Sequence, residues 1–187
     1  MPDAPRHQCL IYDGAPSPHL DSIAQTLIAR LDANYRCLYL NSPPMVAGMR
    51  SHLAAAGVDL QRQTERGALI LSSDQGHLRE GKFDVDRMLQ MLQAALHRAL
   101  ADGFAGLWAS GDMTWELGSE SNLAKLHEYE RRLDQFIEGN PAMSGICLYH
   151  RDTLPPHAVQ TALQTHPARH VDASLWQINP QYYRQLS

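Results

Sequence analysis

The sequence contains no long hydrophobic run and no segment typical of an export signal. Its apolar stretches are short, as at residues 146–149, whereas a membrane-spanning helix needs about 20 consecutive apolar residues. Residues 1–8 lack the apolar segment of a secretory signal peptide. The sequence therefore predicts a cytoplasmic protein that does not insert into a membrane.

Cysteine is scarce, and positive charge does not predominate. The three cysteines, Cys9, Cys37 and Cys147, are scattered and odd in number, which argues against a disulfide framework and for a reducing compartment. The 16 Lys and Arg residues stand against 20 Asp and Glu residues, giving a formal net charge of -4 without a basic stripe. We therefore expect no direct binding to nucleic acid.

Common catalytic and phosphate-binding motifs are also missing. A Walker A loop needs closely spaced glycines, a lysine and a serine or threonine. Residues 13–19, which follow the first predicted strand, contain one glycine, two prolines and no lysine. The dinucleotide-binding pattern GxGxxG and the hydrolase pattern GxSxG do not occur. These absences argue against a P-loop nucleotide hydrolase and a serine hydrolase.

Histidine is common, with 10 residues, but its spacing does not favour a metal site. His166 and His170 form a close pair, yet Pro167 between them interrupts the helix that an i, i+4 zinc pair requires. Cys147 lies in an apolar segment, where cysteine is more often buried than nucleophilic. We therefore predict no metal, no cofactor and no catalytic residue.

Short apolar segments alternate with apolar residues at helical spacing, in units of roughly 30 residues. This alternation predicts a single α/β domain over residues 1–187, with a doubly wound, mainly parallel sheet and helices on both faces in three layers. With 44% hydrophobic residues the chain has enough apolar surface for one core. Predicted strands cover residues 9–12, 36–40, 68–72, 106–111 and 143–149, with a weak strand near 170–171. Capping and proline signals place helix starts near Ser17, Ser42, Asp84, Ser121 and Pro155.

In a sheet of this type, ligands bind beyond the carboxyl ends of the strands. Residues 111–115 follow a predicted strand and include Asp112 and Trp115. Trp115 would supply a flat apolar wall and Asp112 a polar anchor for a small molecule. The alternative is an aspartate at a helix N-terminus and a tryptophan in the core.

A second candidate lies on the helix predicted from Ser121 to residue 139. Tyr129 falls on the apolar face of this helix, and Glu130 lies at the border of that face. Glu130 is either a solvated residue beside its arginine neighbours or a residue turned toward the strand ends, facing Asp112. In the second case the two carboxylates would suit cation binding or acid–base chemistry.

Seven short stretches match a known family in order and spacing: residues 7–12, 36–39, 81–84, 111–115, 129–133, 147–149 and 165–167. On these stretches the chain resembles the MEDS domain, the methanogen/methylotroph DcmR-like sensory domain, from about residue 7 to residue 183. The resemblance implies a sensory role, proposed for the family in the detection of small hydrocarbon derivatives.

The same resemblance implies descent from RecA/KaiC-like ATPases. By position, residues 13–19 replace the Walker A loop, residues 41–43 stand where catalytic glutamates would lie, and residues 108–112 form the Walker B strand. The first two positions lack the required residues, which predicts a binding domain without ATP hydrolysis. No helix-turn-helix accompanies the match. Output through a partner is therefore expected, by way of a histidine kinase, a transcription regulator or a homo-oligomer.

These observations predict a non-catalytic sensor that binds a small, largely apolar molecule over the strand ends. The predicted ligand-binding residues are Tyr12, Asp112, Trp115, Tyr129, Glu130, Tyr149 and Arg151. Binding would change the loop at residues 73–82, or the tail from Trp176, and with it a partner surface. The alternatives are an enzyme, either a degenerate nucleotide-binding ATPase or a catalyst using Asp112 and Glu130, and a scaffold that joins a signalling complex.

Overall fold

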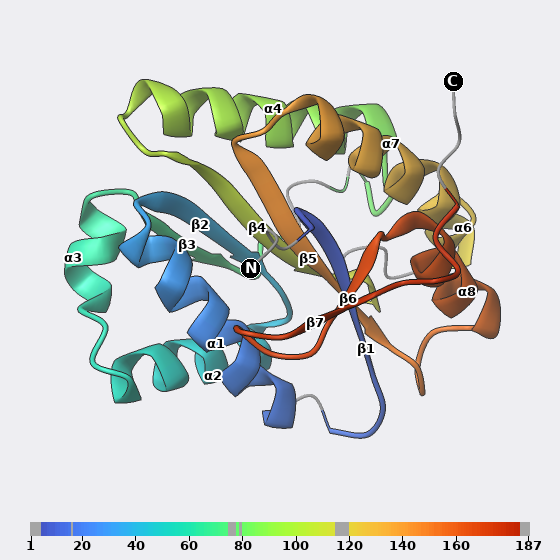
Figure 1. Cartoon of the computed structure of the whole chain (residues 1–187), viewed down its shortest axis with the longest axis horizontal. Coiled ribbons are helices and arrows are strands. Elements are labelled where there is room, and N and C mark those ends of the chain that lie inside the picture. The colour runs from blue at the N-terminus through green and yellow to red at the C-terminus, as the bar shows by residue number, and fades with distance from the viewer. Residues whose placement is uncertain (1–4, 16, 75–77, 79, 115–119, 184–187) are drawn as a thin grey trace.

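The computed structural model describes residues 5–15, 17–74, 78, 80–114 and 120–183 (Figure 1). The strands are β1 (His7–Tyr12), β2 (Tyr35–Leu40), β3 (Leu69–Ser72), β4 (Gly106–Asp112), β5 (Met143–His150), β6 (Ala168–His170) and β7 (Trp176–Ile178). The helices are α1 (Ser17–Asp32), α2 (Pro43–Ala55), α3 (Leu60–Glu65), α4 (Val85–Ala101), α6 (Glu120–Leu123), α7 (Leu126–Gly139) and α8 (Pro156–Thr165). No helix within the described residues is both long and apolar enough to cross a bilayer.

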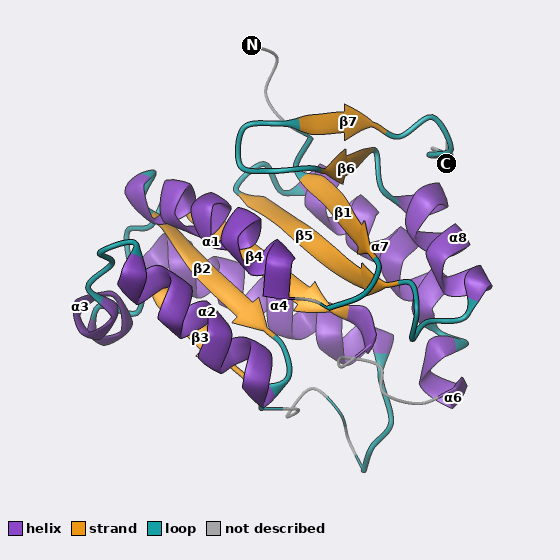
Figure 2. Cartoon of the chain, turned by 90° about the horizontal axis from the view of Figure 1, so that it is seen from below, coloured by secondary structure: helices purple, strands orange, loops and turns teal. Residues whose placement is uncertain are grey.

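The strands form one sheet in the order β3-β2-β4-β5-β1-β6-β7. All neighbouring strands pair in parallel except at one edge, where β7 runs antiparallel to β6. Helices α1 and α2 cover one face of the sheet, and α4 and α7 cover the other (Figure 1, Figure 2). Helix α8 packs beside α7 and β1. The predicted mainly parallel α/β architecture with helices on both faces is confirmed.

Alternation of side chains along the strands divides the core into two layers. In the pairing of β4 with β5, Asp112 lies opposite Leu148, the residue after Cys147. Asp112 and Cys147 therefore point to opposite faces of the sheet. The Tyr12 hydroxyl lies 3.1 Å from the Asp112 carboxylate, and the Tyr12 ring lies 4.9 Å from the ring of His19 in α1. Asp112 and Tyr12 thus share the α1–α2 face, whereas Cys147 faces α7.

The predicted helix starts agree with the structure except at one position. The Asp84 carboxylate caps α4 by accepting a hydrogen bond from the backbone N–H of Arg87 at 3.0 Å, as predicted. The prediction of one helix from Ser121 to residue 139 is wrong, because the chain turns between α6 and α7. The Asn122 side chain holds this turn by accepting a hydrogen bond from the backbone N–H of Phe83 at 2.8 Å.

Candidate functional site

Tyr12 and Asp112 meet on the α1–α2 face of the sheet. Both are buried, and the Tyr12 hydroxyl donates a hydrogen bond to the Asp112 carboxylate at 3.1 Å. Burial, followed by the charge of Asp112, raises the pKa of Tyr12 above its usual value, so the phenol remains a donor. The hollow beside Tyr12 and Leu148 has a volume of only about 10 Å³, which is the lower limit for one water molecule.

Glu130 and Tyr149 lie on the opposite face, where α7 packs on the sheet. Glu130 is completely buried and accepts a hydrogen bond from the Tyr149 hydroxyl. Neither predicted alternative for Glu130 holds, because the residue is not solvated and the sheet separates it from Asp112. The reason is that α7 buries residues at positions 126, 129, 130, 133 and 137, so Glu130 belongs to the inward stripe.

The remaining predicted site residues lie apart from these. The Tyr129 ring packs edge-on against Phe83 with ring centroids 5.1 Å apart, beside a hollow of about 30 Å³. Arg151 forms an ion pair with Asp13 at 3.1 Å, in which both side chains are more than half exposed. Such pairs contribute about 0–1 kcal/mol. Trp115 lies outside the described residues. The described members of the predicted site therefore do not line one common pocket.

The structure instead gathers four titratable side chains beneath α7 and α8. We call them the buried cluster: His7 at the start of β1, Glu130 in α7, Cys147 in β5 and His166 at the end of α8. Their exposed fractions are 2%, 0%, 6% and 0%. One nitrogen, oxygen or sulfur atom from each residue lies within 4.8 Å of the other three. Of these residues, only Glu130 belongs to the site predicted from the sequence.

The Glu130 carboxylate lies at the centre of the buried cluster. Its Oε2 atom is 3.5 Å from Nε2 of His7 and 3.5 Å from Nε2 of His166. The Sγ atom of Cys147 is 3.7 Å from the same oxygen and 3.8 Å from Nε2 of His7. The two imidazole rings are 4.0 Å apart between centroids. The four side chains therefore converge on one small volume.

The other nitrogen of each imidazole is held from outside the cluster. Nδ1 of His7 lies 2.9 Å from Oδ1 of Asp134, and Nδ1 of His166 lies 2.9 Å from the backbone carbonyl oxygen of Ala162. A carboxylate and a carbonyl accept hydrogen bonds, so both Nδ1 atoms carry a proton. This arrangement turns both Nε2 atoms toward Glu130.

Burial disfavours the charged form of Glu130, His7 and His166, and the neighbouring groups determine whether the pKa of each is raised or lowered. At Glu130 burial opposes ionisation, but attraction to His166 and His7 outweighs it and lowers the pKa below its usual value. At His7 burial opposes protonation, but the hydrogen bonds to Asp134 and Glu130 outweigh it and raise the pKa. Burial, with repulsion from His7, lowers the pKa of His166 to about 4. These shifts favour the ionised form of Glu130, the protonated form of His7 and the neutral form of His166.

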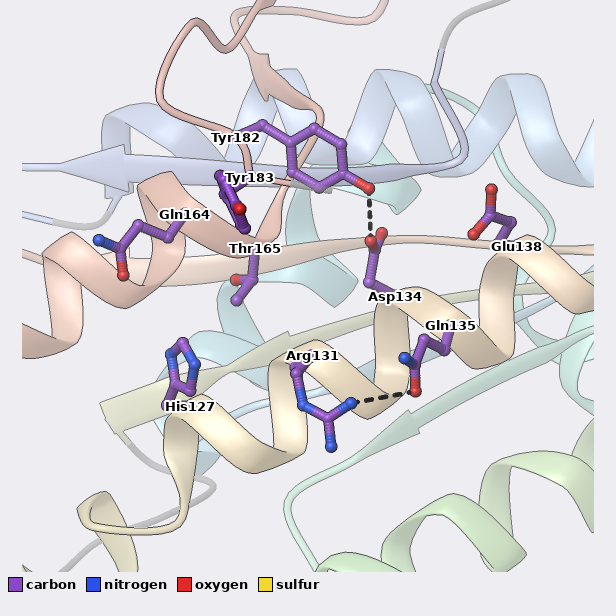
Figure 3. A pocket seen from close by; sticks show the side chains of 9 residues that line it. All are labelled: His127, Arg131, Asp134, Gln135, Glu138, Gln164, Thr165, Tyr182 and Tyr183. Atoms are coloured by element: carbon purple, nitrogen blue, oxygen red, sulfur yellow. Dashed lines mark hydrogen bonds between the residues drawn. The ribbon is translucent and has the colours of Figure 1, made fainter. Parts of the chain in front are cut away.

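A larger hollow of about 210 Å³ opens beside the cluster, between α7, α8 and the segment that follows β7 (Figure 3). Its walls combine polar and apolar surface and include Arg131, Asp134 and Glu138 from α7 and Tyr182 from the C-terminal segment. Asp134 belongs to both places, because its Oδ1 atom accepts from His7 while its Oδ2 atom accepts from the Tyr182 hydroxyl at 2.7 Å. One carboxylate therefore connects the hollow to the buried cluster.

A family model covers most of the chain, including the part that holds the buried cluster. The family model described as the MEthanogen/methylotroph, DcmR Sensory domain (MEDS) matches residues 6–167. The chain belongs to the MEDS family. All four residues of the buried cluster lie within the match, whereas Tyr182 of the hollow lies beyond it. No curated protein matches the chain. Membership gives this MEDS domain a role in sensing or signalling.

His7, Cys147 and His166 cannot be recognised as a set from the sequence. His7 and Cys147 approach each other only because β1 pairs with β5, and nothing local specifies that pairing. The sequence spacing pairs His166 with His170. In the structure, however, His170 forms a hydrogen bond with Ser22 in α1 and does not belong to the cluster. One usable signal is Glu130 itself, since a carboxylate inside an apolar helical stripe needs buried partners.

Proposed function

We propose that this MEDS domain is a non-catalytic sensor that binds a small molecule in the hollow between α7 and α8. The observation that carries the proposal is the double role of Asp134, whose two oxygens face the hollow and the buried cluster. A ligand that competes with Tyr182 for this carboxylate changes the contacts of His7 as well. Occupancy of the hollow would therefore be transmitted to the centre of the domain.

The walls of the hollow favour a small organic molecule whose polar group donates a hydrogen bond to Asp134 and offers an oxygen atom to Arg131. Arg131 offers a guanidinium group, which pairs well with carboxylate or phosphate oxygens. Tyr182 and Tyr183 offer aromatic rings for an apolar part. The volume of about 210 Å³ is below the range of roughly 300–1,000 Å³ typical of drug-sized ligands. A short hydrocarbon derivative with one polar substituent fits these limits.

The C-terminal segment provides a route for the signal. It docks on α7 through the Tyr182 hydroxyl and on α8 through the backbone N–H of Tyr183, which donates to the carbonyl of Gln164 at 3.0 Å. A ligand that displaces Tyr182 would favour a state in which this segment is released, provided that it binds that state more tightly. The altered surface would then engage a histidine kinase, a transcription regulator or a second copy of the chain.

A ligand screen by thermal shift and calorimetry tests the proposal, with short alcohols, amines, carboxylates and halogenated methanes as probes. A ligand at 100 times its Kd should add about 2.7 kcal/mol to the free energy of unfolding. Arg131→Ala should weaken binding about tenfold through loss of a charged hydrogen bond. Arg132→Ala is the matched control, because Arg132 pairs with Asp86 at 2.6 Å outside the hollow. Equal effects of the two variants would contradict the proposed site.

We also propose that the domain does not hydrolyse nucleotides. Support comes from residues 13–19, which lack a lysine, and from the placement of Asp112 and Glu130 on opposite faces of the sheet. With ATP and Mg²⁺, phosphate release should not exceed that of buffer. If the wild-type chain releases phosphate and the Asp112→Asn variant does not, the enzymatic alternative is correct instead.

A further inference from the structure

We propose that the buried cluster binds one divalent transition-metal ion, with Zn²⁺ as the best fit. The ligand atoms are Nε2 of His7, Oε2 of Glu130, Sγ of Cys147 and Nε2 of His166, which converge from four different elements. The proposal assigns a resident cation to the core of the domain. It does not depend on the ligand hollow, so the two proposals can fail separately.

Four of the six distances between the ligand atoms are close to those of a tetrahedral metal site. Zinc bonds of about 2.0–2.2 Å to nitrogen and oxygen and about 2.3 Å to sulfur place neighbouring ligand atoms roughly 3.3–3.7 Å apart. In the cluster, Oε2 of Glu130 is 3.5 Å from both imidazole nitrogens, and the Cys147 sulfur lies 3.7 and 3.8 Å from its two nearest neighbours. The two remaining distances, from Nε2 of His166 to the His7 nitrogen and to the Cys147 sulfur, are at most 4.8 Å, so His166 is the ligand that would have to move inward to bind an ion.

The contacts around the cluster orient each ligand for coordination. Histidines that bind metals donate their other N–H to a carboxylate or a backbone carbonyl. Nδ1 of His7 meets Asp134 in this way, and Nδ1 of His166 meets the carbonyl of Ala162, each at 2.9 Å. The Tyr149 hydroxyl bonds to the outer oxygen of the central carboxylate and leaves the inner oxygen for the ion. The second layer of a metal site is therefore in place.

The Nε2 atom of His166 is an independent observation that points to a cation. It is buried, it points toward Oε2 of Glu130 at 3.5 Å, and it has no hydrogen-bond partner among the residues that the structure describes. An unsatisfied buried polar atom costs about 1–3 kcal/mol. A hydrogen-bonded network alone leaves this nitrogen unsatisfied, whereas a cation bound by the cluster satisfies it.

The donor set identifies the class of ion. Two imidazoles and a thiolate favour Zn²⁺ and similar transition metals over Mg²⁺ and Ca²⁺, which prefer oxygen ligands. Four buried protein ligands leave no open coordination position, which is typical of a structural zinc site rather than a catalytic one. Such an ion would join β1 and β5 to α7 and α8, and would thereby hold together the two helices that form the hollow.

Metal analysis of the full chain tests the proposal. After removal of metal with a chelator, reconstitution with Zn²⁺ and desalting, the chain should retain one ion. With Co²⁺ in place of Zn²⁺, it should show a thiolate-to-cobalt charge-transfer band and the intense d–d bands of a tetrahedral site. If the chain retains Zn²⁺ but no small molecule of the screen binds in the hollow, only the proposed sensory pocket is contradicted.

Two cysteine variants separate a metal ligand from a merely buried thiol. Cys147→Ala should abolish the charge-transfer band and weaken Zn²⁺ binding roughly 100-fold or more. Cys37→Ala is the matched control, because Cys37 is also buried but lies in β2, and this variant should keep one ion and the band. The proposal is overturned if the wild-type chain, folded by circular dichroism, gives no thiolate band with Co²⁺. It is also overturned if the two variants behave alike.

Discussion

The Tyr149 hydroxyl on β5 donates a hydrogen bond to the Glu130 carboxylate on α7, and both side chains are completely buried. Burial and the charge of Glu130 raise the pKa of Tyr149 well above its usual value, so the phenol stays protonated and remains the donor. The bond occupies one oxygen of the carboxylate and leaves the other to His7 and His166. Because Tyr149 binds one oxygen, the other oxygen of the buried glutamate is available to the two histidines and to the proposed metal ion.

Removal of the Tyr149 hydroxyl should destabilise the fold. Tyr149→Phe leaves one oxygen of a buried carboxylate without its donor, and a hydrogen bond to a charged group contributes about 1.5–3 kcal/mol. Urea denaturation should show a loss of about 2 kcal/mol in the free energy of unfolding. Tyr183→Phe, at a side chain that is 73% exposed, serves as the control and should show almost no change. Equal stability of the two variants would argue against the role assigned to Tyr149.

Asp134 should control the affinity of the buried cluster for Zn²⁺. Asp134→Asn removes the carboxylate that orients His7, and loss of such an outer partner weakens metal binding by about 10–100-fold. Competition with a zinc-sensitive dye measures this change. Asp86→Asn, at an exposed carboxylate on α4 that pairs with Arg132, should leave the affinity unchanged. A cluster that binds Zn²⁺ equally well in both variants would show that Asp134 has no part in the site.

His170 should make the fold less stable in mild acid. Burial lowers its pKa from the ordinary value of 6.5 to about 4, and its ring lies 2.7 Å from the Ser22 hydroxyl. The unfolded chain therefore takes up the proton first as the pH falls through about 6.5, and protonation favours unfolding. Between about pH 7 and pH 5 this group alone should remove about 2 kcal/mol from the free energy of unfolding.

The variant His170→Asn isolates that contribution. Unfolding free energies of wild type and variant should be measured across the same pH range, because other histidines also respond to acid. The two curves should converge as the pH falls, since the variant lacks the group that becomes protonated. Parallel curves would mean that His170 titrates alike in the folded and unfolded chains.

Tyr12 should contribute to stability but not to sensing. Tyr12→Phe removes the hydrogen bond to the buried Asp112 and should lower the free energy of unfolding by about 1–3 kcal/mol. It should not alter Zn²⁺ binding or ligand binding, because Tyr12 lies on the other face of the sheet from the buried cluster. A change in either affinity would instead support the ligand pocket that the sequence predicts over the strand ends.

The sequence predicts the alternation of strands and helices well, because each element has its own local signal. The Asp84 cap and the apolar stripe of α4 show this most clearly. Elements without a strong signal are missed: α3, β7 and the turn between α6 and α7. That turn depends on Asn122, which bonds to the segment before α4 rather than to its own helix. Contacts of this kind join residues that are far apart in the chain, so the local pattern of apolar and polar residues does not predict them.

The candidate site is harder to predict, because it depends on which strands become neighbours. The sheet places β5 between β4 and β1, and only this order brings Cys147 close to His7. The same register separates Asp112 from Glu130, two carboxylates that the sequence alone allows to meet. His166 joins the cluster from the end of α8, a position fixed by packing against α7. Each relationship spans a long stretch of chain, so residue spacing carries no information about it.

The most direct measurement of the central claim is anomalous diffraction at the zinc absorption edge, from crystals of the Zn²⁺-reconstituted chain. The account predicts one dominant peak among the ligand atoms of His7, Glu130, Cys147 and His166, at about 2.0–2.3 Å from each. Absence of that peak, or a dominant peak elsewhere, such as beside the surface pair of His150 and Asp152, would contradict it.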